Sequence, residues 1–402
     1  MCSVGEGFED EGGSRMEKAA SANWKGGKCN KCRENDPVIL LRKKDAYCKA
    51  CFLAGANHKF KALLGKSKLI HPKDRVLIAC ETGHPTMSLL HLLRSGLDLN
   101  TQKKLRFEPV LVYVEDNYHM SIGERQRIIR SINNETSRLK FPLHLVSFAD
   151  SINRKNVLIS QKSLALNRCD QGKVNAMFDQ SINKTNRRQL LHIMKRNILL
   201  TVAKQLNCKY IFTPELSMDI ASSLLTNIAL GRGSQVPDDT GFCDGRDSEV
   251  KILRPLRNFD MKELAMYNVF HKLEPVSVNP AQIDQYSSVQ DLMSYFIIDL
   301  QENYPATITT VVKTGDKLAL NQSMIAVQCK LCQSAILRNS KGLSSAESTR
   351  FSKLTSNELP DHNVSGPERY LKLTEKSDHS PQERQQYCFS CSKLSRHLLE
   401  EI

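Results

Sequence analysis

The sequence predicts an α/β protein in which a doubly wound, five-stranded parallel sheet is flanked by a four-cysteine module at each end of the chain. The first indication is that short apolar, β-branched segments alternate with helical ones over residues 75–275. The second is that eight of the 13 cysteines form four Cys-x-x-Cys pairs, with two pairs toward each end. The third is a length of 402 residues with 40% hydrophobic residues, which suffices for one large core and small modules.

The positive charge of the chain is concentrated near its beginning. The formal net charge is +14, and residues 25–75 alone contain fourteen Lys or Arg against four Asp or Glu. Clustered cations gain affinity for polyanions by counterion release, so we expect this region to contact a nucleic-acid phosphate backbone. A merely solvated surface is the alternative.

The first residues and the hydropathy pattern indicate the compartment. Residues 1–24 are rich in Gly, Glu, Asp and Ser, and we expect them to be disordered. They show neither a secretory signal nor the glycine at position 2 that myristoylation requires. No apolar run approaches the about 20 residues that span a bilayer. We therefore expect a cytoplasmic protein without membrane contact.

Residues 25–57 are predicted to form a zinc-ribbon-like module. Cys29-x-x-Cys32 and Cys48-x-x-Cys51 are separated by 15 residues, a spacing typical of two knuckles around one tetrahedral ion. Without a secretory signal, the pairs favour metal ligation over disulfides. We predict zinc as the cofactor, although an iron–sulfur cluster also accepts four thiolates. The basic residues of this module that we expect to bind RNA are Lys28, Lys31, Arg33, Arg42, Lys43 and Lys44.

Residues 58–74 are predicted to form a basic helix or a basic linker into the α/β domain of residues 75–275. The predicted strands are residues 76–79, 109–114, 143–148, 208–212 and 250–253. The predicted helices are residues 85–95, 119–140, 187–206, 216–230 and 260–270. Apolar residues recur at helical spacing from Leu190 to Val202, and Asp260 is a favourable N-cap. The polar segments 149–186 and 231–247 are expected to be long loops.

Residues 76–93 have the strand–turn–helix order that places nucleotide phosphates at a helix N-terminus. Such a cradle needs several glycines, but this turn has only Gly83. Thr82 narrows the approach, and Pro85 lacks an N–H group. Glu81 adds a negative charge that repels phosphate. We therefore predict that ATP is not a cofactor of this chain.

The second cysteine set is predicted to form one site despite its wide spacing. Cys329-x-x-Cys332 and Cys388-x-x-Cys391 are separated by 55 residues. Loop closure entropy grows only slowly with length, so residues 339–386 can be a disordered insertion in this module. The C-terminal region, residues 276–402, also contains a predicted amphipathic helix at 282–304. Two separate redox pairs are the alternative.

Three segments of residues 75–270 resemble the PP-loop ATP pyrophosphatases, which are adenine nucleotide alpha hydrolase-like, and more closely the cytosolic tRNA 2-thiolation enzymes. In that family the first turn is SGGxDS, a middle segment is TGHNxDD, and RPL precedes a helix with Glu and Tyr. The matching positions are Gly83, Thr86, Thr213, Asp219, Arg254, Pro255, Leu256, Glu263 and Tyr267. The departing positions are Glu81, Thr82, Pro85, Pro214, Glu215 and Leu216. The degenerate PP-loop and the two cysteine modules together resemble the non-catalytic subunit of the cytoplasmic tRNA 2-thiolation complex.

This resemblance implies a subunit without catalytic residues, which binds tRNA and forms a heterodimer with a catalytic PP-loop paralogue. The complex modifies the wobble uridine of cytosolic tRNA-Lys, tRNA-Glu and tRNA-Gln to 5-methoxycarbonylmethyl-2-thiouridine. The paralogue uses ATP, and the sulfur comes from a thiocarboxylated ubiquitin-related modifier. The alternatives are an ATP-binding tRNA-modifying enzyme in its own right and a zinc-ribbon RNA-binding adaptor.

Two further cysteines lie where the thiolating relatives carry reactive ones. They are Cys169 and Cys243, and neither belongs to a Cys-x-x-Cys pair. A sulfur relay or an iron–sulfur cluster is the functional interpretation, but a cluster normally needs three or four thiolates. We expect both to be free loop cysteines.

Overall fold

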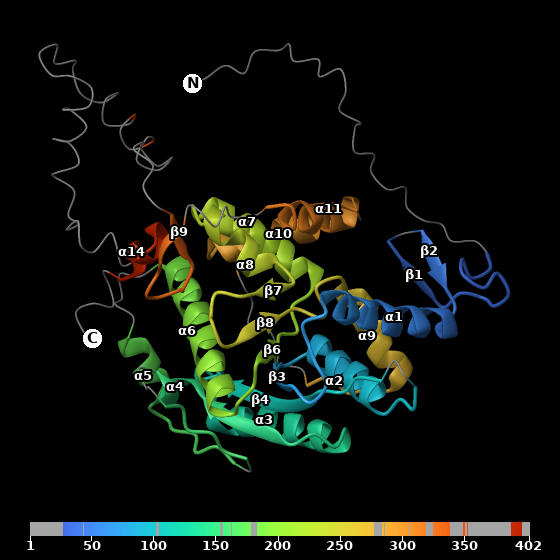
Figure 1. Ribbon diagram of the computed structural model, residues 1–402, viewed down its shortest axis with the longest axis horizontal. Helices are drawn as coiled ribbons and strands as arrows, with labels where there is room; N and C mark the ends of the chain where they lie inside the picture. Colours follow the sequence, from blue (N-terminus) through green and yellow to red (C-terminus); the bar gives the residue numbers. More distant parts are fainter. Residues whose placement is uncertain are drawn as a thin grey trace, which may run out of the picture.

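The structure is a computed structural model that describes most of the chain (Figure 1). The described residues are 27–337, with gaps at 43, 102–103, 153–155, 162, 178–182, 277–283, 285, 305 and 319–324, and residues 349, 352 and 387–395. The tail expected at residues 1–24 lies outside them, as does the insertion expected at 339–386 apart from residues 349 and 352.

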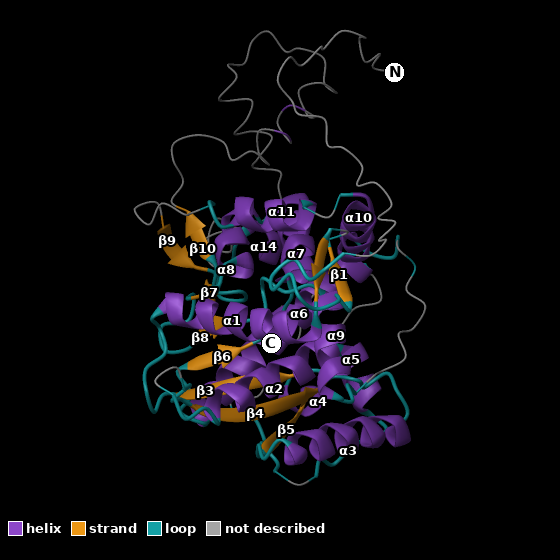
Figure 2. Ribbon diagram, turned by 90° about the vertical axis from the view of Figure 1, so that its right-hand side faces the viewer, coloured by secondary structure: helices purple, strands orange, loops and turns teal. Residues whose placement is uncertain are grey.

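A six-stranded sheet of order β5-β4-β3-β6-β8-β7 forms the centre of the molecule (Figures 1 and 2). The strands are β3 (Arg75–Cys80), β4 (Glu108–Glu115), β5 (Leu143–Ser147), β6 (Tyr210–Phe212), β7 (Cys243–Asp244) and β8 (Lys251–Leu253). The five predicted strands are parallel, which confirms the fold class. The sixth strand, β7, pairs antiparallel with β8 and was not predicted, because two residues have no detectable period.

Helices cover both faces of this sheet, as in a doubly wound fold. They are α2 (His84–Leu97), α3 (Ile122–Arg138), α4 (Phe148–Ser151), α5 (Asp170–Ala176), α6 (Lys184–Gln205), α7 (Ser217–Ala229) and α9 (Met261–His271). Alternate residues of β3 are buried in two different hydrophobic cores. Val76 and Ile78 pack with α2, α3 and α9, whereas Leu77 and Ala79 pack with α4, α5 and α6. The predicted cap is confirmed, because the side chain of Asp260 accepts a hydrogen bond from the Glu263 N–H at 2.7 Å.

Both segments expected to be long loops contain regular structure. The segment 149–186 includes α5, and the buried Arg125 of α3 joins Asp170 at the start of α5 to Glu115 at the end of β4. The segment 231–247 contains the 3-10 helix η1 (Gly233–Gln235), α8 (Val236–Thr240) and β7. These elements are too short to give a periodic signal, and long-range contacts determine them.

The N-terminal module joins the α/β domain through one continuous helix. The hairpin of β1 (Ile39–Leu41) and β2 (Asp45–Tyr47) precedes α1 (Lys49–Ser67). The boundary expected between residues 57 and 58 lies inside α1, and residues 58–67 take the helical form of the predicted basic helix or linker. Phe60 and Leu64 are buried in the same core as β3, which anchors this helix.

The C-terminal region adds a helical layer and a second small sheet. Helices α10 (Val289–Asn303) and α11 (Thr307–Gly315) pack their apolar residues on α7. The helix predicted at 282–304 begins only at residue 289, after the N-cap Ser288. The hairpin of β9 (Ile325–Gln328) and β10 (Ala335–Leu337) and helix α14 (Phe389–Ser395) lie beside α6 (Figure 1). Within the described ranges, no helix combines the length and apolarity needed to cross a membrane.

Candidate functional site

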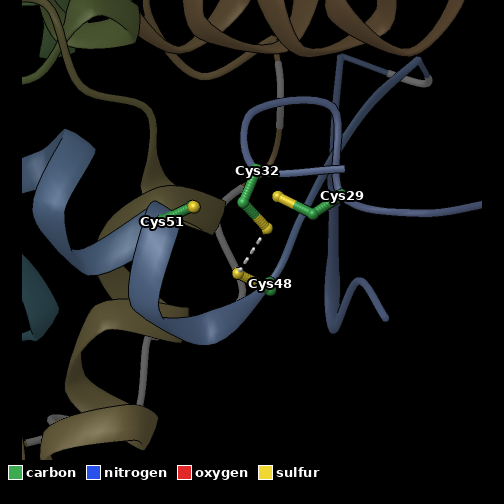
Figure 3. A group of neighbouring side chains, drawn as sticks. All are labelled: Cys29, Cys32, Cys48 and Cys51. Carbon is green, nitrogen blue, oxygen red and sulfur yellow. Dashed lines mark hydrogen bonds between the residues drawn. The ribbon is translucent and has the colours of Figure 1, made fainter. Parts of the chain in front are cut away.

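The N-terminal cysteines converge in three dimensions (Figure 3). Cys29 and Cys32 come from the loop before β1, Cys48 precedes α1, and Cys51 lies in its first turn. Their four sulfur atoms lie within 4.8 Å of one another. The Cys32 and Cys48 sulfur atoms are 3.9 Å apart, close to the edge of about 3.8 Å of a tetrahedron with four Zn–S bonds. The four side chains therefore fit a single tetrahedral metal ion.

The C-terminal cysteines also form one cluster, although 55 residues separate their pairs. Cys329 and Cys332 lie at the turn between β9 and β10, and Cys388 and Cys391 lie at the start of α14. All four side chains are buried, and the Cys332 and Cys388 sulfur atoms are 3.7 Å apart. The prediction of a second four-cysteine site is confirmed in its geometry. A closed four-thiolate shell leaves no open position for a substrate, so a metal here supports the fold.

A buried network of ion pairs holds this C-terminal cluster against the α/β domain. The guanidinium of Arg246 donates hydrogen bonds to Asp239 at 2.6 Å, to Asp244 at 2.7 Å and to the hydroxyl of Ser334 at 3.0 Å. Arg196 of α6 also donates to Asp244, at 3.0 Å. Burial alone would raise the pKa of Asp244, but Arg246 and Arg196 hold it well below its usual range.

Two side-chain amides also attach α14 to the α/β domain. The side chain of Gln235 donates to the Cys388 sulfur at 3.1 Å, and that of Gln189 donates to the Ser390 hydroxyl at 2.9 Å. Sequence reasoning missed these partners and the arginine network, because each joins residues far apart in the chain. The only available signal was the unusual charge density of residues 238–247 in an otherwise unpatterned segment.

The degenerate turn lies at the carboxyl end of β3, where a PP-loop binds phosphate. Two of its backbone N–H groups are used inside the protein. The Glu81 N–H donates to the hydroxyl of Thr86 at 3.0 Å, and the Gly83 N–H donates to the carbonyl of Val276 at 2.8 Å. Gly83 has a φ of 104°, which a side chain rarely adopts, and Pro85 has no N–H group. Glu81, Gly83 and Pro85 therefore offer no free backbone donor to a ligand.

An internal cation occupies the same end of the sheet. The ammonium group of Lys195, on α6, lies 3.0 Å from Glu81 and 2.8 Å from Asp116. Burial would lower the pKa of Lys195, but these two carboxylates raise it above its ordinary value. Glu81 is therefore not the isolated negative charge that the sequence suggested, because Lys195 neutralises much of its charge. The loss of free N–H groups is therefore the stronger reason against phosphate binding.

The other motif residues hold elements together. Arg254 donates to Glu215 and to the carbonyls of Asp238 and Gly241, and so fixes the segment before β7. Glu263 accepts from Lys59 of α1 at 2.8 Å, and the Tyr267 hydroxyl lies 2.9 Å from a ring nitrogen of His91. These contacts explain why the RPL segment is present in a chain with an altered PP-loop.

The basic residues proposed for RNA contact are exposed wherever the structure describes them. They are Lys28, Lys31, Arg33, Arg42 and Lys44, while Lys43 lies outside the described residues. Lys28 pairs with the exposed Asp36 at 2.9 Å. RNA contact by this set stays a prediction.

Cys169 and Cys243 do not join either cluster of the described cysteines. Cys169 is exposed at the N-cap of α5, and Cys243 lies on β7, where burial raises the pKa of its thiol. The expectation that both lie in loops is wrong for Cys243, which lies on a strand, and their lack of a role in sulfur chemistry stays a prediction.

The unaltered chain is expected to bind labelled ATP too weakly to detect at millimolar concentration in equilibrium dialysis. The reason is that the N–H groups of Glu81 and Gly83 already donate hydrogen bonds within the protein, and Pro85 has no N–H group. Gly83→Asp is the informative variant. ATP binding by the unaltered chain that Gly83→Asp abolishes would contradict this expectation and indicate an active nucleotide site.

Comparisons with known proteins give a consistent result. The family model described as cytoplasmic tRNA 2-thiolation protein 2 matches residues 288–393. The protein of that name from Anopheles gambiae is 31% identical over 89% of this chain and 87% of its own length. The one from Aedes aegypti is 32% identical over 79% of this chain and 73% of its own length. Cytoplasmic tRNA 2-thiolation protein 2-B of Xenopus laevis is 28% identical over 90% of this chain and 82% of its own length.

One solved structure is similar over most of its length. It is the U34-tRNA thiolase NcsA from Methanococcus maripaludis, described with its 4Fe–4S cluster. The TM-score is 0.57 at 18% identity, over 79% of this chain and 98% of that chain. At this identity the likeness establishes the fold, which is that of the PP-loop-type enzymes.

Proposed function

Because the chain belongs to the cytoplasmic tRNA 2-thiolation protein 2 family, we propose that it is a non-catalytic subunit required for 2-thiolation of the wobble uridine in cytosolic tRNA. The substrates are tRNA-Lys, tRNA-Glu and tRNA-Gln. The chain forms a heterodimer in the cytoplasm with a catalytic PP-loop paralogue. The paralogue activates the uridine with ATP and receives sulfur from a thiocarboxylated ubiquitin-related modifier.

One observation carries the non-catalytic assignment. The fold keeps its strand–turn–helix joint, yet the N–H groups of Glu81 and Gly83 bond within the protein and Lys195 pairs with two carboxylates at the same sheet edge. A pyrophosphate cradle needs those N–H groups pointing at the ligand. The strand–turn–helix joint therefore has a structural role in this chain, and the paralogue supplies the ATP chemistry.

The two cysteine clusters are proposed to bind one zinc ion each. Their residues are Cys29, Cys32, Cys48 and Cys51, and Cys329, Cys332, Cys388 and Cys391. Four thiolates around one zinc ion give a closed structural site. The N-terminal site orders the loop that carries Lys28, Lys31 and Arg33, and these exposed cations are suited to tRNA phosphates.

The test is complementation of cells that lack this protein, with 2-thiouridine in tRNA-Lys measured by mass spectrometry. The modification is expected to be lost without the protein and restored by the unaltered chain. Lys31→Glu with Arg33→Glu should restore it poorly, because two phosphate contacts become repulsive. The matched control is Lys313→Glu with Lys317→Glu, two exposed residues near the end of α11.

Two results would overturn the proposal. One is normal thiolation in the cells without the protein, which points to the RNA-binding adaptor instead. The other is purification of the intact chain from cells without any PP-loop paralogue bound to it.

A further inference from the structure

A cavity of about 590 Å³ lies at the opposite end of β3 from the degenerate turn. Its walls come from α1, from the segment before β3 that includes His71, and from the segment before β4 that includes Lys104 and Arg106. None of the residues proposed for RNA or metal binding lines it. The cavity is therefore separate from the sites described above.

The ionisable side chains that line this cavity are all basic. It contains two lysines, one arginine and two histidines, and no acidic residue among those that the structure describes there. Lys104 and Arg106 are exposed, and neither makes an ion pair with a described acidic side chain. Lys104 and Arg106 thus present positive charge at a concave surface, which favours an anionic ligand.

The floor of the cavity is apolar. Phe107 and Leu64 are buried beneath it, and the Phe107 ring is held edge-on by Phe212 at 5.7 Å between centroids. The exposed imidazoles of His58 and His71 lie at its walls. RNA-binding proteins stack unpaired bases on histidine and phenylalanine rings, and a cavity of this volume has room for a small ligand.

We infer that this cavity binds one unpaired nucleotide of a bound tRNA. The base rests on the apolar floor, and the flanking phosphates contact Lys104 and Arg106. Exposed Lys66 and Lys68, at the end of α1, continue the positive surface beside the cavity. The inference rests on the proposed function, because it names a second contact for the same tRNA.

Filling the cavity without changing its charge tests the base contact. Ala62 and Gly65 line the cavity from α1, and a Cβ at Gly65 meets no atom within 4 Å. Ala62→Leu with Gly65→Leu is therefore compatible with the helix. The double variant of the full chain should bind a wobble-uridine tRNA transcript about tenfold more weakly, with an unchanged salt dependence. Ala229→Leu with Gly123→Leu, both on exposed helix positions, is the control and should bind normally.

Reversing the charge tests the phosphate contact separately. Lys104→Glu with Arg106→Glu should also weaken tRNA binding, and should lower the slope of log affinity against log salt by about two. Lys313→Glu with Lys317→Glu changes the net charge equally and is the control. Circular dichroism and thermal unfolding confirm that each variant is folded.

The outcomes separate this inference from the proposed function. If the unaltered chain binds no tRNA alone or with the paralogue, both fail. If it binds tRNA and the filled variant binds equally well, the cavity assignment alone is overturned. Binding of AMP that only the filled variant loses, with tRNA binding intact, would instead show a free nucleotide as the ligand. Loss of an acidic protein partner without loss of tRNA would also overturn the inference.

Discussion

Replacing Arg246 with methionine is expected to lower the free energy of unfolding by about 3–5 kcal/mol, because two buried carboxylates lose their nearest counter-charge. Arg246 is 5% exposed, and it contacts Asp239 and the fully buried side chain of Asp244. Arg196 still pairs with Asp244 at 3.0 Å and Arg232 with Asp239 at 3.5 Å, but each carboxylate loses its shorter ion pair. The measurement is denaturant unfolding at pH 7, with Arg130→Met as the control. Arg130 lies exposed on α3, so its replacement should change stability by about 0.5 kcal/mol or less.

The pH dependence gives this prediction a second readout. In the unaltered protein the pKa of Asp244 is held well below its usual range, so the ion network contributes fully above about pH 4 and is lost only at lower pH. In the Arg246→Met variant that pKa rises, and Asp244 takes up a proton at higher pH. The stability difference between variant and unaltered protein should therefore shrink from pH 7 toward pH 4. An equal difference at both pH values would contradict the role assigned to Arg246.

The sheet was predictable because its signal is local. Strand β3 is apolar almost throughout, as expected for a strand covered on both faces, and the flanking helices have periodic apolar residues. The cysteine clusters were predictable for a different reason. Two Cys-x-x-Cys pairs can share one ion at any separation, since the cost of a longer loop is small. Both clusters form as expected, including the one whose pairs are 55 residues apart.

What the sequence did not show depends on pairs that are distant in the chain. Lys195 reaches Asp116, 79 positions earlier, and only the fold reveals that it also pairs with Glu81. Gln235 reaches Cys388, 153 positions later. Such contacts leave no periodic or compositional trace, because either partner alone looks like an ordinary polar residue. The same limit applies to the cavity, whose walls come from three separate segments.

The internal ion pair also changes the reason behind the prediction that this turn does not bind a nucleotide. Charge repulsion by Glu81 alone would be reversible by one substitution. In the structure, however, the N–H groups of Glu81 and Gly83 bond within the protein, and α6 supplies a cation that two carboxylates already share. We therefore predict that nucleotide binding requires concerted changes at the turn and at Lys195. The turn is best understood as a structural joint between β3 and α2.

Replacing Cys391 with serine is expected to remove one of two bound metal ions per chain and to destabilise the protein by several kcal/mol. Metal binding by such clusters is coupled directly to folding, so a lost ligand reduces the free energy of unfolding. Cys391 is 0% exposed, and its cluster joins α14 to the β9–β10 hairpin and to α6. The measurements are metal content by elemental analysis and denaturant unfolding, with the exposed Cys169→Ser as the control that should retain both ions.

The N-terminal cluster offers an internal comparison for the same experiment. Cys32 and Cys51 are only half-buried, whereas all four C-terminal cysteines are buried. Cys51→Ser should therefore also remove one ion but cost less stability, because less packed structure depends on that site. Two ions retained in Cys391→Ser would contradict a four-cysteine metal site. A disulfide between Cys388 and Cys391 in the metal-free native protein would support separate redox pairs instead, and the arginine network would then anchor a redox element in place of a metal centre.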